Sequence, residues 1–282
     1  MPAFNAASLR SMLAACTLAL MTLPALSLPN DKCRTTGTFD EWMVGFRAEA
    51  AAKGIRPDVI SASLDGVTYD QKVYNADRGQ GVFRQTFEQF SARMISSHRV
   101  QKGTSLLKQH AALLQRIEKE FGVPGPVIVA IWGLETDYGA NIGNIQSIRA
   151  LATLAYDCRR SAMFRGELLA ALQIVQRGDL KPTTMRGAWA GELGQTQFLP
   201  STYLKYAVDY GGGRDLLRSP ADVLASTANY LKGFGWKPGQ GWQPGQPNFE
   251  TILLWNKAQV YARTIAAFAS RLAEASGYQA SR

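Results

Sequence analysis

An uninterrupted apolar segment, Val127 to Leu134, leads directly into a carboxylate at Glu135. A run of this kind is typical of a segment that is buried on every side. Prolines at 124 and 126 and a glycine at 139 predict a helix that ends before Gly139, with Glu135 in its last turn. Burial and the negative end of the helix dipole both raise the pKa of a carboxyl there, as a general acid requires. The alternative is a helix-end Glu that faces water or pairs with an Arg.

Residues 1–27 differ in composition from the rest of the chain. Arg10 is their only charged residue, residues 11–23 are mostly apolar, and Ala25-Leu26-Ser27 resembles the cleavage site of a secretory signal peptide. We therefore expect residues 1–27 to be removed on export. A lipoprotein cleavage site that ends at Cys16 is the alternative, and it would give an outer-membrane lipoprotein. No later stretch approaches the roughly 20 apolar residues of a transmembrane helix.

Export would leave two cysteines, Cys33 and Cys158, in an oxidising compartment. A disulfide between them is the natural prediction, and two free buried thiols are the alternative. The formal net charge of +9 suits an anionic partner such as cell-wall polymer, lipid headgroups or nucleic acid. Charge alone does not choose among these partners.

Helical periodicity continues along most of the chain, whereas alternation of the β type lasts only two or three residues at a time. The expected helices lie at about 39–53, 57–65, 82–95, 103–121, 148–156, 164–175, 200–210, 220–232 and 252–275. Residues 187–200 are rich in small and amide residues without a clear period, which predicts an irregular segment. The fold class is therefore all-α.

Several kinds of chemistry find no support in the sequence. Neither of the two histidines, His98 and His110, has a second His or a Cys at metal-ligand spacing. The chain lacks a G-x-S-x-G motif, a phosphate-binding loop and a dinucleotide fingerprint. The S-x-x-K match at Ser105 to Lys108 has no companion motif. Acid/base chemistry by carboxylates remains, and we expect neither a metal nor a cofactor.

Five ordered motifs carry a family resemblance. They are Gly133 to Gly139 (GLETDYG), Ala150 to Leu154 (ALATL), Arg159-Arg160, Ala190 to Tyr203 (AGELGQTQFLPSTY) and Ala228-Asn229-Tyr230. Together they resemble the lytic murein transglycosylase B family over roughly residues 33–275. The resemblance implies a bacterial cell-wall enzyme with a lysozyme-like, all-α catalytic domain and additional flanking helices. It also implies cleavage of the β-1,4 bond between N-acetylmuramic acid and N-acetylglucosamine, which leaves a 1,6-anhydro ring instead of adding water.

The same resemblance implies how the chain is organised and where it works. A helical subdomain of residues 34–120 and 250–282 is expected to pack on a lysozyme-like core of residues 121–249, without a separate C-terminal wall-binding module. The mature protein, residues 28–282, is expected in the periplasm as a monomer. Its expected partners are peptidoglycan glycan strands and, secondly, the cell-wall synthesis or division machinery, but no nucleic acid.

The family's catalytic carboxylate falls on Glu135, which would act first as acid and then as base. The paired arginines, Arg159 and Arg160, would contact peptide or lactyl carboxylates of the substrate, with a solvated face as the alternative. Gln197 would face the sugar, and two tyrosines, Tyr230 and Tyr261, would line the cleft. A tyrosine at 230 could equally be a core residue with a satisfied hydroxyl.

Some positions depart from the family pattern. Trp255 and Phe90 stand where tyrosines are expected, which keeps an aromatic ring and removes two hydroxyls. Ala188 stands in place of a serine near the catalytic Glu. The loop from Asp209 to Asp215 has glycines where a calcium loop needs oxygen ligands, so no calcium site is expected.

Two other functions stay open at this point. One is hydrolysis by an inverting, lysozyme-like route, in which Asp137 or Glu192 activates water. The other is a catalytically silent peptidoglycan-binding protein, against which the intact Glu135 argues.

Overall fold

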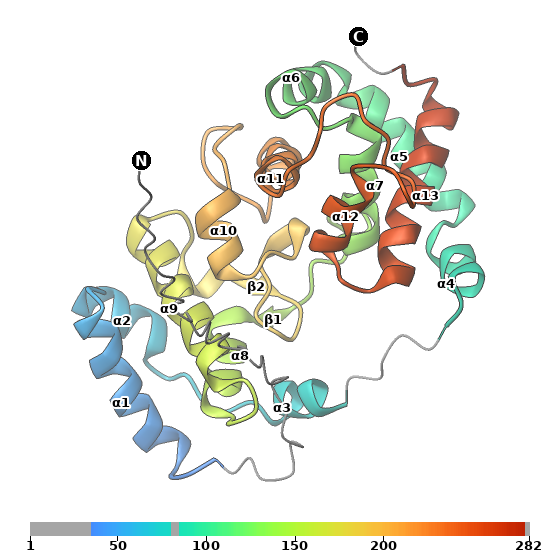
Figure 1. Ribbon diagram of the computed structural model, residues 1–282. Coiled ribbons are helices and arrows are strands. Elements are labelled where there is room, and N and C mark those ends of the chain that lie inside the picture. Colours follow the sequence, from blue (N-terminus) through green and yellow to red (C-terminus); the bar gives the residue numbers. More distant parts are fainter. Residues whose placement is uncertain (1–34, 80–84, 280–282) are drawn as a thin grey trace, which may run out of the picture. The chain divides into compact units, whose positions relative to one another are not determined.

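The computed structural model describes residues 35–79 and 85–279 (Figure 1). The predicted signal peptide, Cys16 and Cys33 lie outside these residues. Within the described ranges the fold is helical with one two-stranded sheet, which confirms the all-α prediction. The helices are α1 (Phe39–Ala52), α2 (Pro57–Leu64), α3 (Gln71–Arg78), α4 (Phe87–Met94), α5 (Ser97–Gln109), α6 (Ala111–Phe121), α7 (Gly125–Thr136), α8 (Ser147–Tyr156), α9 (Ser161–Arg177), α10 (Pro200–Tyr206), α11 (Pro220–Gly233), α12 (Phe249–Trp255) and α13 (Gln259–Ser276). None of the helices described is long and apolar enough to cross a membrane.

Helix α7 is the most deeply buried element of the fold. Every residue in it except Glu135 is buried. It packs against α5, α6, α11, α13 and the short turn η3 (Gly194–Thr196), so it has no face that would favour polar residues. The helix ends at Asp137, whose backbone is left-handed (φ 51°). Glu135 therefore lies in the last turn, as the sequence predicts.

Helices from the middle and the C-terminal part of the chain enclose α7, whereas the N-terminal helices pack elsewhere. The last helix, α13, packs along α7, α5 and α4, while α1, α2 and α3 belong to a group with α8 and α9 (Figure 1). The red C-terminal helices thus lie beside green helices from the middle of the sequence. The expected division into a helical subdomain and a lysozyme-like core stays a prediction.

Two expected helices are each divided in two. The segment at 103–121 breaks at His110, because α5 packs on α13 and α7 whereas α6 packs mainly on α11. The segment at 252–275 breaks at residues 256–258, where the Asn256 Oδ1 atom accepts a hydrogen bond from the Ala258 N–H (3.0 Å). Apolar periodicity continues across both breaks, so the pattern alone does not reveal them. The short polar helix α3 was not expected.

The predicted irregular segment begins at the sheet. Strand β1 (Ile145–Gln146) pairs antiparallel with β2 (Arg186–Gly187), with Ile145 opposite Gly187. A Cβ atom at Gly187 would overlap the backbone carbonyl of Glu192, so only glycine fits there. Residues 191–200 then fold back through η3, and an isolated bridge joins Leu193 to Phe198. This segment is irregular, as predicted.

Gly103 on α5 allows this helix to approach the residues that follow Glu135. A Cβ atom added there would lie 2.4 Å from the Tyr138 hydroxyl oxygen and 2.8 Å from Leu272 Cδ2. We expect Gly103→Ala to lower the free energy of unfolding by about 1–3 kcal/mol through overpacking. Gly166 on α9 is the matched control, because a Cβ atom there meets nothing within 4 Å. Gly166→Ala should raise the same free energy by about 0.5–1 kcal/mol.

Chemical denaturation followed by far-ultraviolet circular dichroism measures both values. Equal changes in the two variants would contradict the close approach of α5 to Tyr138.

Candidate active site

The carboxylate of Glu135 is held by two donors from the C-terminal part of the chain. The Trp255 Nε1–H donates to Glu135 Oε1 (2.8 Å), and the Tyr261 hydroxyl donates to the same oxygen (2.9 Å). The Oε2 atom has no hydrogen-bond partner among the described residues. If the carboxyl is protonated, both donors keep Oε1 as an acceptor, so the proton is held on Oε2.

Burial raises the pKa of Glu135 above its usual value. The hydrogen bonds from Trp255 and Tyr261 oppose this increase, because they favour the charged carboxylate, and the negative charge of Glu192 adds to it. The position at the C-terminal end of α7 acts in the same direction as burial. The pKa of Tyr261 is also raised well above its ordinary value, mainly by burial, so its hydroxyl stays a donor.

Glu135 opens into a cavity of about 370 Å³. The cavity is lined by Glu135, Glu192, Thr196, Gln197, Phe198, Leu199, Thr202, Tyr230, Trp255 and Asn256. The structure thus brings Gln197, Tyr230 and Trp255 together with Glu135 in one cavity. Tyr261, which was expected to line the cleft, is not among the lining residues, and neither are Phe90 and Ala188. Phe90 is buried and packs against the ring of Tyr261 (centroids 6.0 Å apart), so it helps to fix the position of that ring.

Trp255 and Tyr230 form the aromatic wall of the cavity. Their rings meet edge to face with centroids 4.9 Å apart, and the Tyr230 hydroxyl donates to the Leu254 carbonyl (2.9 Å). Tyr230 is therefore both a cleft residue and a residue with a satisfied hydroxyl. The family resemblance implies that a tyrosine hydroxyl is lost at Trp255. The structure shows that the indole N–H of Trp255 donates to Glu135 instead. The break between α12 and α13 places Trp255 and Tyr261 on the same carboxylate.

The segment 191–200 is fixed to α7 by a buried glutamine. The Trp132 Nε1–H donates to Gln195 Oε1 (2.8 Å), and the Thr136 hydroxyl donates to the Gln195 carbonyl (2.9 Å). Gln197 has a left-handed backbone (φ 53°), and its Nε2 donates to the carbonyls of Ile142 and Gly194. These bonds hold the cavity residues of this segment in a set position relative to Glu135.

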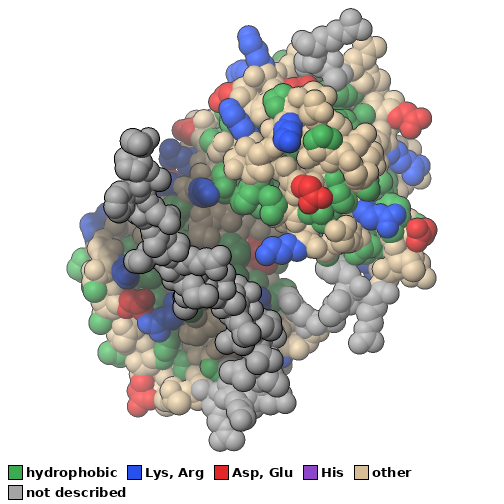
Figure 2. All heavy atoms as spheres, viewed as in Figure 1, with side chains coloured by type: hydrophobic (Ala, Val, Ile, Leu, Met, Phe, Trp, Pro, Cys, Tyr) green, Lys and Arg blue, Asp and Glu red, His purple; other side chains and the backbone are tan. Residues whose placement is uncertain are grey.

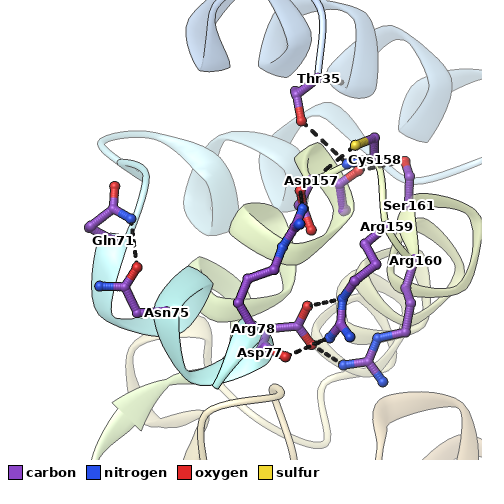
Figure 3. A network of polar contacts seen from close by, with 11 residues as sticks. Thr35, Gln71, Asn75, Asp77, Arg78, Asp157, Cys158, Arg159, Arg160 and Ser161 are labelled. Atoms are coloured by element: carbon purple, nitrogen blue, oxygen red, sulfur yellow. Dashed lines mark hydrogen bonds and ion pairs between the residues drawn. The ribbon is translucent and has the colours of Figure 1, made fainter. Parts of the chain in front are cut away.

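The two arginines expected to contact substrate are bound to one buried aspartate. Asp77 on α3 is 2% exposed and accepts hydrogen bonds from both Arg159 and Arg160, as Figure 3 shows. The Arg159 Nε–H to Asp77 Oδ2 distance is 2.7 Å. Next to this cluster, Arg78 donates to Asp157 (2.7 Å). Neither arginine lines the cavity at Glu135, and neither is simply a solvated surface residue.

The sequence did not indicate the place of two cavity residues, Glu192 and Thr196. Glu192 appeared only as a candidate base for water, and Thr196 was not singled out. Both lie in the motif AGELGQTQFLPSTY (Ala190 to Tyr203), and their position in this motif is the feature of the sequence that could have indicated them. Asp137, the other candidate base, does not line this cavity; its carboxylate pairs with Arg99 (3.2 Å).

The loop from Asp209 to Asp215 is held by the carboxylates of Asp209 within it and of Asp222 on α11. Asp209 Oδ1 accepts from the N–H groups of Gly212 and Gly213, and Asp222 Oδ1 accepts from those of Tyr210 and Gly211. Over residues 35–79 and 85–279 no group of three His, Cys, Asp or Glu side chains is placed to hold a metal ion.

The predicted disulfide involves a residue that the structure does not describe. The Thr35 hydroxyl oxygen accepts a hydrogen bond from the Cys158 N–H (3.3 Å), so the described chain begins beside Cys158 (Figure 3). Cys33 lies outside the described residues, and its pairing with Cys158 stays a prediction.

Comparison with known proteins agrees with this geometry. The family described as "Transglycosylase SLT domain" matches residues 38–246. The membrane-bound lytic murein transglycosylase B of Escherichia coli (strain K12) is 38% identical over 152 residues, which are 53% of this chain and 42% of that protein. The matched region thus spans less than half the length of that curated relative.

Solved structures match over a larger share of the chain. SltB3 from Pseudomonas aeruginosa, in complex with NAG-NAM-pentapeptide, is 33% identical with a TM-score of 0.80, covering 84% of this chain and 80% of that one. The Escherichia coli lytic transglycosylase Slt35, in complex with calcium, is 26% identical with a TM-score of 0.75, covering 84% of this chain and 94% of that one. Because the family match spans most of the sequence and includes Glu135 and the cavity segment 191–200, the chain belongs to the transglycosylase SLT-domain family.

Proposed function

We propose that the chain is a peptidoglycan lytic transglycosylase that cleaves the β-1,4 bond between N-acetylmuramic acid and N-acetylglucosamine without adding water. The observation that carries this proposal is the environment of Glu135. One carboxylate oxygen is held by Trp255 and Tyr261, and the other has no partner among the described residues, in a cavity of about 370 Å³. A relative named as a lytic murein transglycosylase, and one solved with NAG-NAM-pentapeptide, support the same substrate.

In the first step, the proton on Glu135 Oε2 passes to the glycosidic oxygen as its bond to the anomeric carbon breaks. The carboxylate that remains is stabilised by the donors already bound to Oε1. In the second step, this carboxylate accepts the proton of the sugar's 6-hydroxyl while that oxygen bonds to the anomeric carbon. Glu135 is then protonated again, and the product carries a 1,6-anhydro ring.

Hydrolysis is the second candidate, because Glu192 lines the same cavity as Glu135. A second carboxylate that activates water would turn the enzyme into a muramidase. The named relatives favour the route without water, because they are described as lytic transglycosylases. Lytic transglycosylation is therefore the better supported of the two.

The remaining sequence predictions belong to this proposal. They are export through residues 1–27, a periplasmic location with the lipoprotein at Cys16 as the alternative, a Cys33–Cys158 disulfide, a monomeric state, and glycan strands as the main partner. On the face shown in Figure 2, Lys and Arg side chains are interspersed with Asp and Glu. The charge visible on this face is therefore mixed, and it does not by itself select a partner.

Glu135→Gln should abolish the release of soluble 1,6-anhydromuropeptides from purified sacculi, because the amide cannot supply the proton. We expect a loss of about 10²-fold or more in kcat. Mass spectrometry of the digest measures the product, since hydrolysed ends are heavier than anhydro ends by one water molecule. Glu274→Gln, at an exposed position on α13, is the control and should keep wild-type activity. An active Glu135→Gln protein would exclude Glu135 as the acid.

The pH dependence of kcat should report the raised pKa of Glu135. The acid must be protonated, so activity should fall as pH rises through this pKa. The bond from Tyr261 lowers the pKa, so Tyr261→Phe should move the alkaline limb of the profile to higher pH and also reduce kcat. Tyr278→Phe, which removes a hydroxyl that donates to Glu118 outside the cavity, is the matched control and should leave the limb in place. A limb that moves to lower pH in Tyr261→Phe would contradict this assignment.

We further propose that Arg159 and Arg160 bind carboxylates of the substrate's peptide while Asp77 holds them in position. Arg160 is the better candidate for a test, because its side chain is more exposed than that of Arg159 (34% against 21%). Arg160→Ala should raise KM for intact sacculi about tenfold, the value of one charge-assisted hydrogen bond. It should leave KM for peptide-free glycan strands unchanged. Arg177→Ala, which removes an arginine at the C-terminal end of α9 that pairs with Asp179, should change neither value.

A further inference from the structure

One residue that lines the cavity has a buried hydroxyl. Thr196 is 3% exposed, and its Oγ1 atom is buried without a hydrogen-bond partner among the described residues. A polar group in this state costs free energy, and native structures seldom tolerate it without a reason. Thr196 lines the same cavity as Glu135. A ligand in that cavity that paired with this hydroxyl would remove the cost.

Glu192, which lines the same cavity, has one carboxylate oxygen that makes no hydrogen bond to the described residues. The Ala190 N–H donates to Glu192 Oε2 (2.9 Å), and Oε1 has no partner among the residues described. The backbone of Glu192 is held in place, because the Ser147 hydroxyl donates to its carbonyl (3.2 Å) and Gly187 packs directly on that carbonyl. The charged groups that act on Glu192 include Arg160, and Glu192 in turn acts on Glu135. A carboxylate held in this way presents a fixed acceptor.

We propose that Glu192 and Thr196 form a subsite that binds one polar substituent of the sugar next to the scissile bond, with Glu192 accepting from it and Thr196 donating to it. This inference rests on the proposed function. An acetamido group fits, because its N–H can donate and its carbonyl can accept; a ring hydroxyl fits as well, because it does both through one oxygen. Glu192 and Thr196 are positioning residues that set the sugar against Glu135 Oε2.

Gln197 fits the same arrangement. Its Nε2 atom is used by the carbonyls of Ile142 (3.0 Å) and Gly194 (2.7 Å), so only its oxygen is left for a ligand. Glu192 Oε1 and the Gln197 side-chain oxygen are thus two acceptors that a donating substituent could use.

Glu192→Gln tests the acceptor without changing the shape of the side chain. The Ala190 N–H keeps the amide oxygen, so the NH₂ group replaces Oε1 and presents a donor where the substrate also donates. We expect KM for sacculi to rise about tenfold or more, because a site built to pair with a polar group is left with a mismatch. The value of kcat should change less than about threefold, and the products should keep their anhydro ends.

Thr196→Val is the second variant, in case the first fails to fold. It should raise KM about three- to tenfold, the value of one neutral hydrogen bond. If both residues bind the same substituent, the effects in the double variant should be less than additive. Glu250→Gln and Thr183→Val, at exposed positions outside the cavity, are the matched controls and should have the wild-type KM. Thermal unfolding of each protein checks that its fold is intact.

Calorimetric titration identifies the substituent. The Glu135→Gln protein, with and without Thr196→Val, is titrated with a chito-oligosaccharide and with its de-N-acetylated form. If Thr196→Val weakens binding of the acetylated form alone, the acetamido group is bound; if it weakens binding of both, a ring hydroxyl is bound. Either result supports the subsite.

Other outcomes overturn the proposal. If the wild-type protein is active but Glu192→Gln and Thr196→Val keep its KM and its oligosaccharide affinity, no such subsite exists. If Glu192→Gln lowers kcat alone and the wild-type products are hydrolysed, Glu192 is the base for water. If the wild-type protein releases no product from sacculi, the proposed function fails, whereas the titrations still decide the subsite.

Discussion

A carboxylate at the end of a fully buried helix is the constraint on which the rest of this structure depends. Placing a carboxyl in apolar surroundings disfavours its charged form, which suits an acid but leaves no water to stabilise the carboxylate after the proton has gone. Trp255 and Tyr261 resolve this conflict, because both donate to the same oxygen of Glu135. One oxygen is thus kept for the protein and the other for the substrate.

This arrangement needs the protein to hold α7, the segment 191–200 and the C-terminal helices in fixed relative positions. Gln195 joins the second to the first through Trp132 and Thr136, and α13 packs along α7. The packing has little room to spare, since a single added carbon at Gly103 would overlap Tyr138. Stability and site geometry therefore rest on the same contacts.

Charges elsewhere in the molecule follow a similar logic. Arg159 and Arg160 are partly exposed cations, and the buried carboxylate of Asp77 orients both of them. The sequence indicated the pair but not its partner, because α3 is a short polar helix with no strong pattern. The glycine-rich loop at 209–215 likewise uses its carboxylates to bind backbone N–H groups within the loop.

Local pattern determined the all-α class, the buried helix at 125–136 and the place of Glu135 in its last turn, because burial and helix ends leave a signal within a few residues. The ordered motifs also indicated the family and most of the cavity residues. Only the tertiary structure decided that Trp255 supplies a donor, that Asp77 holds the arginine pair, and that the buried Thr196 hydroxyl has no partner among the described residues. These features join residues 82 to 120 positions apart, as in the Asp77–Arg159 and Trp255–Glu135 bonds, or depend on which atoms surround a hydroxyl. Sequence periodicity reports only on neighbours within a few residues, so it indicates neither long-range contacts nor the surroundings of a single atom.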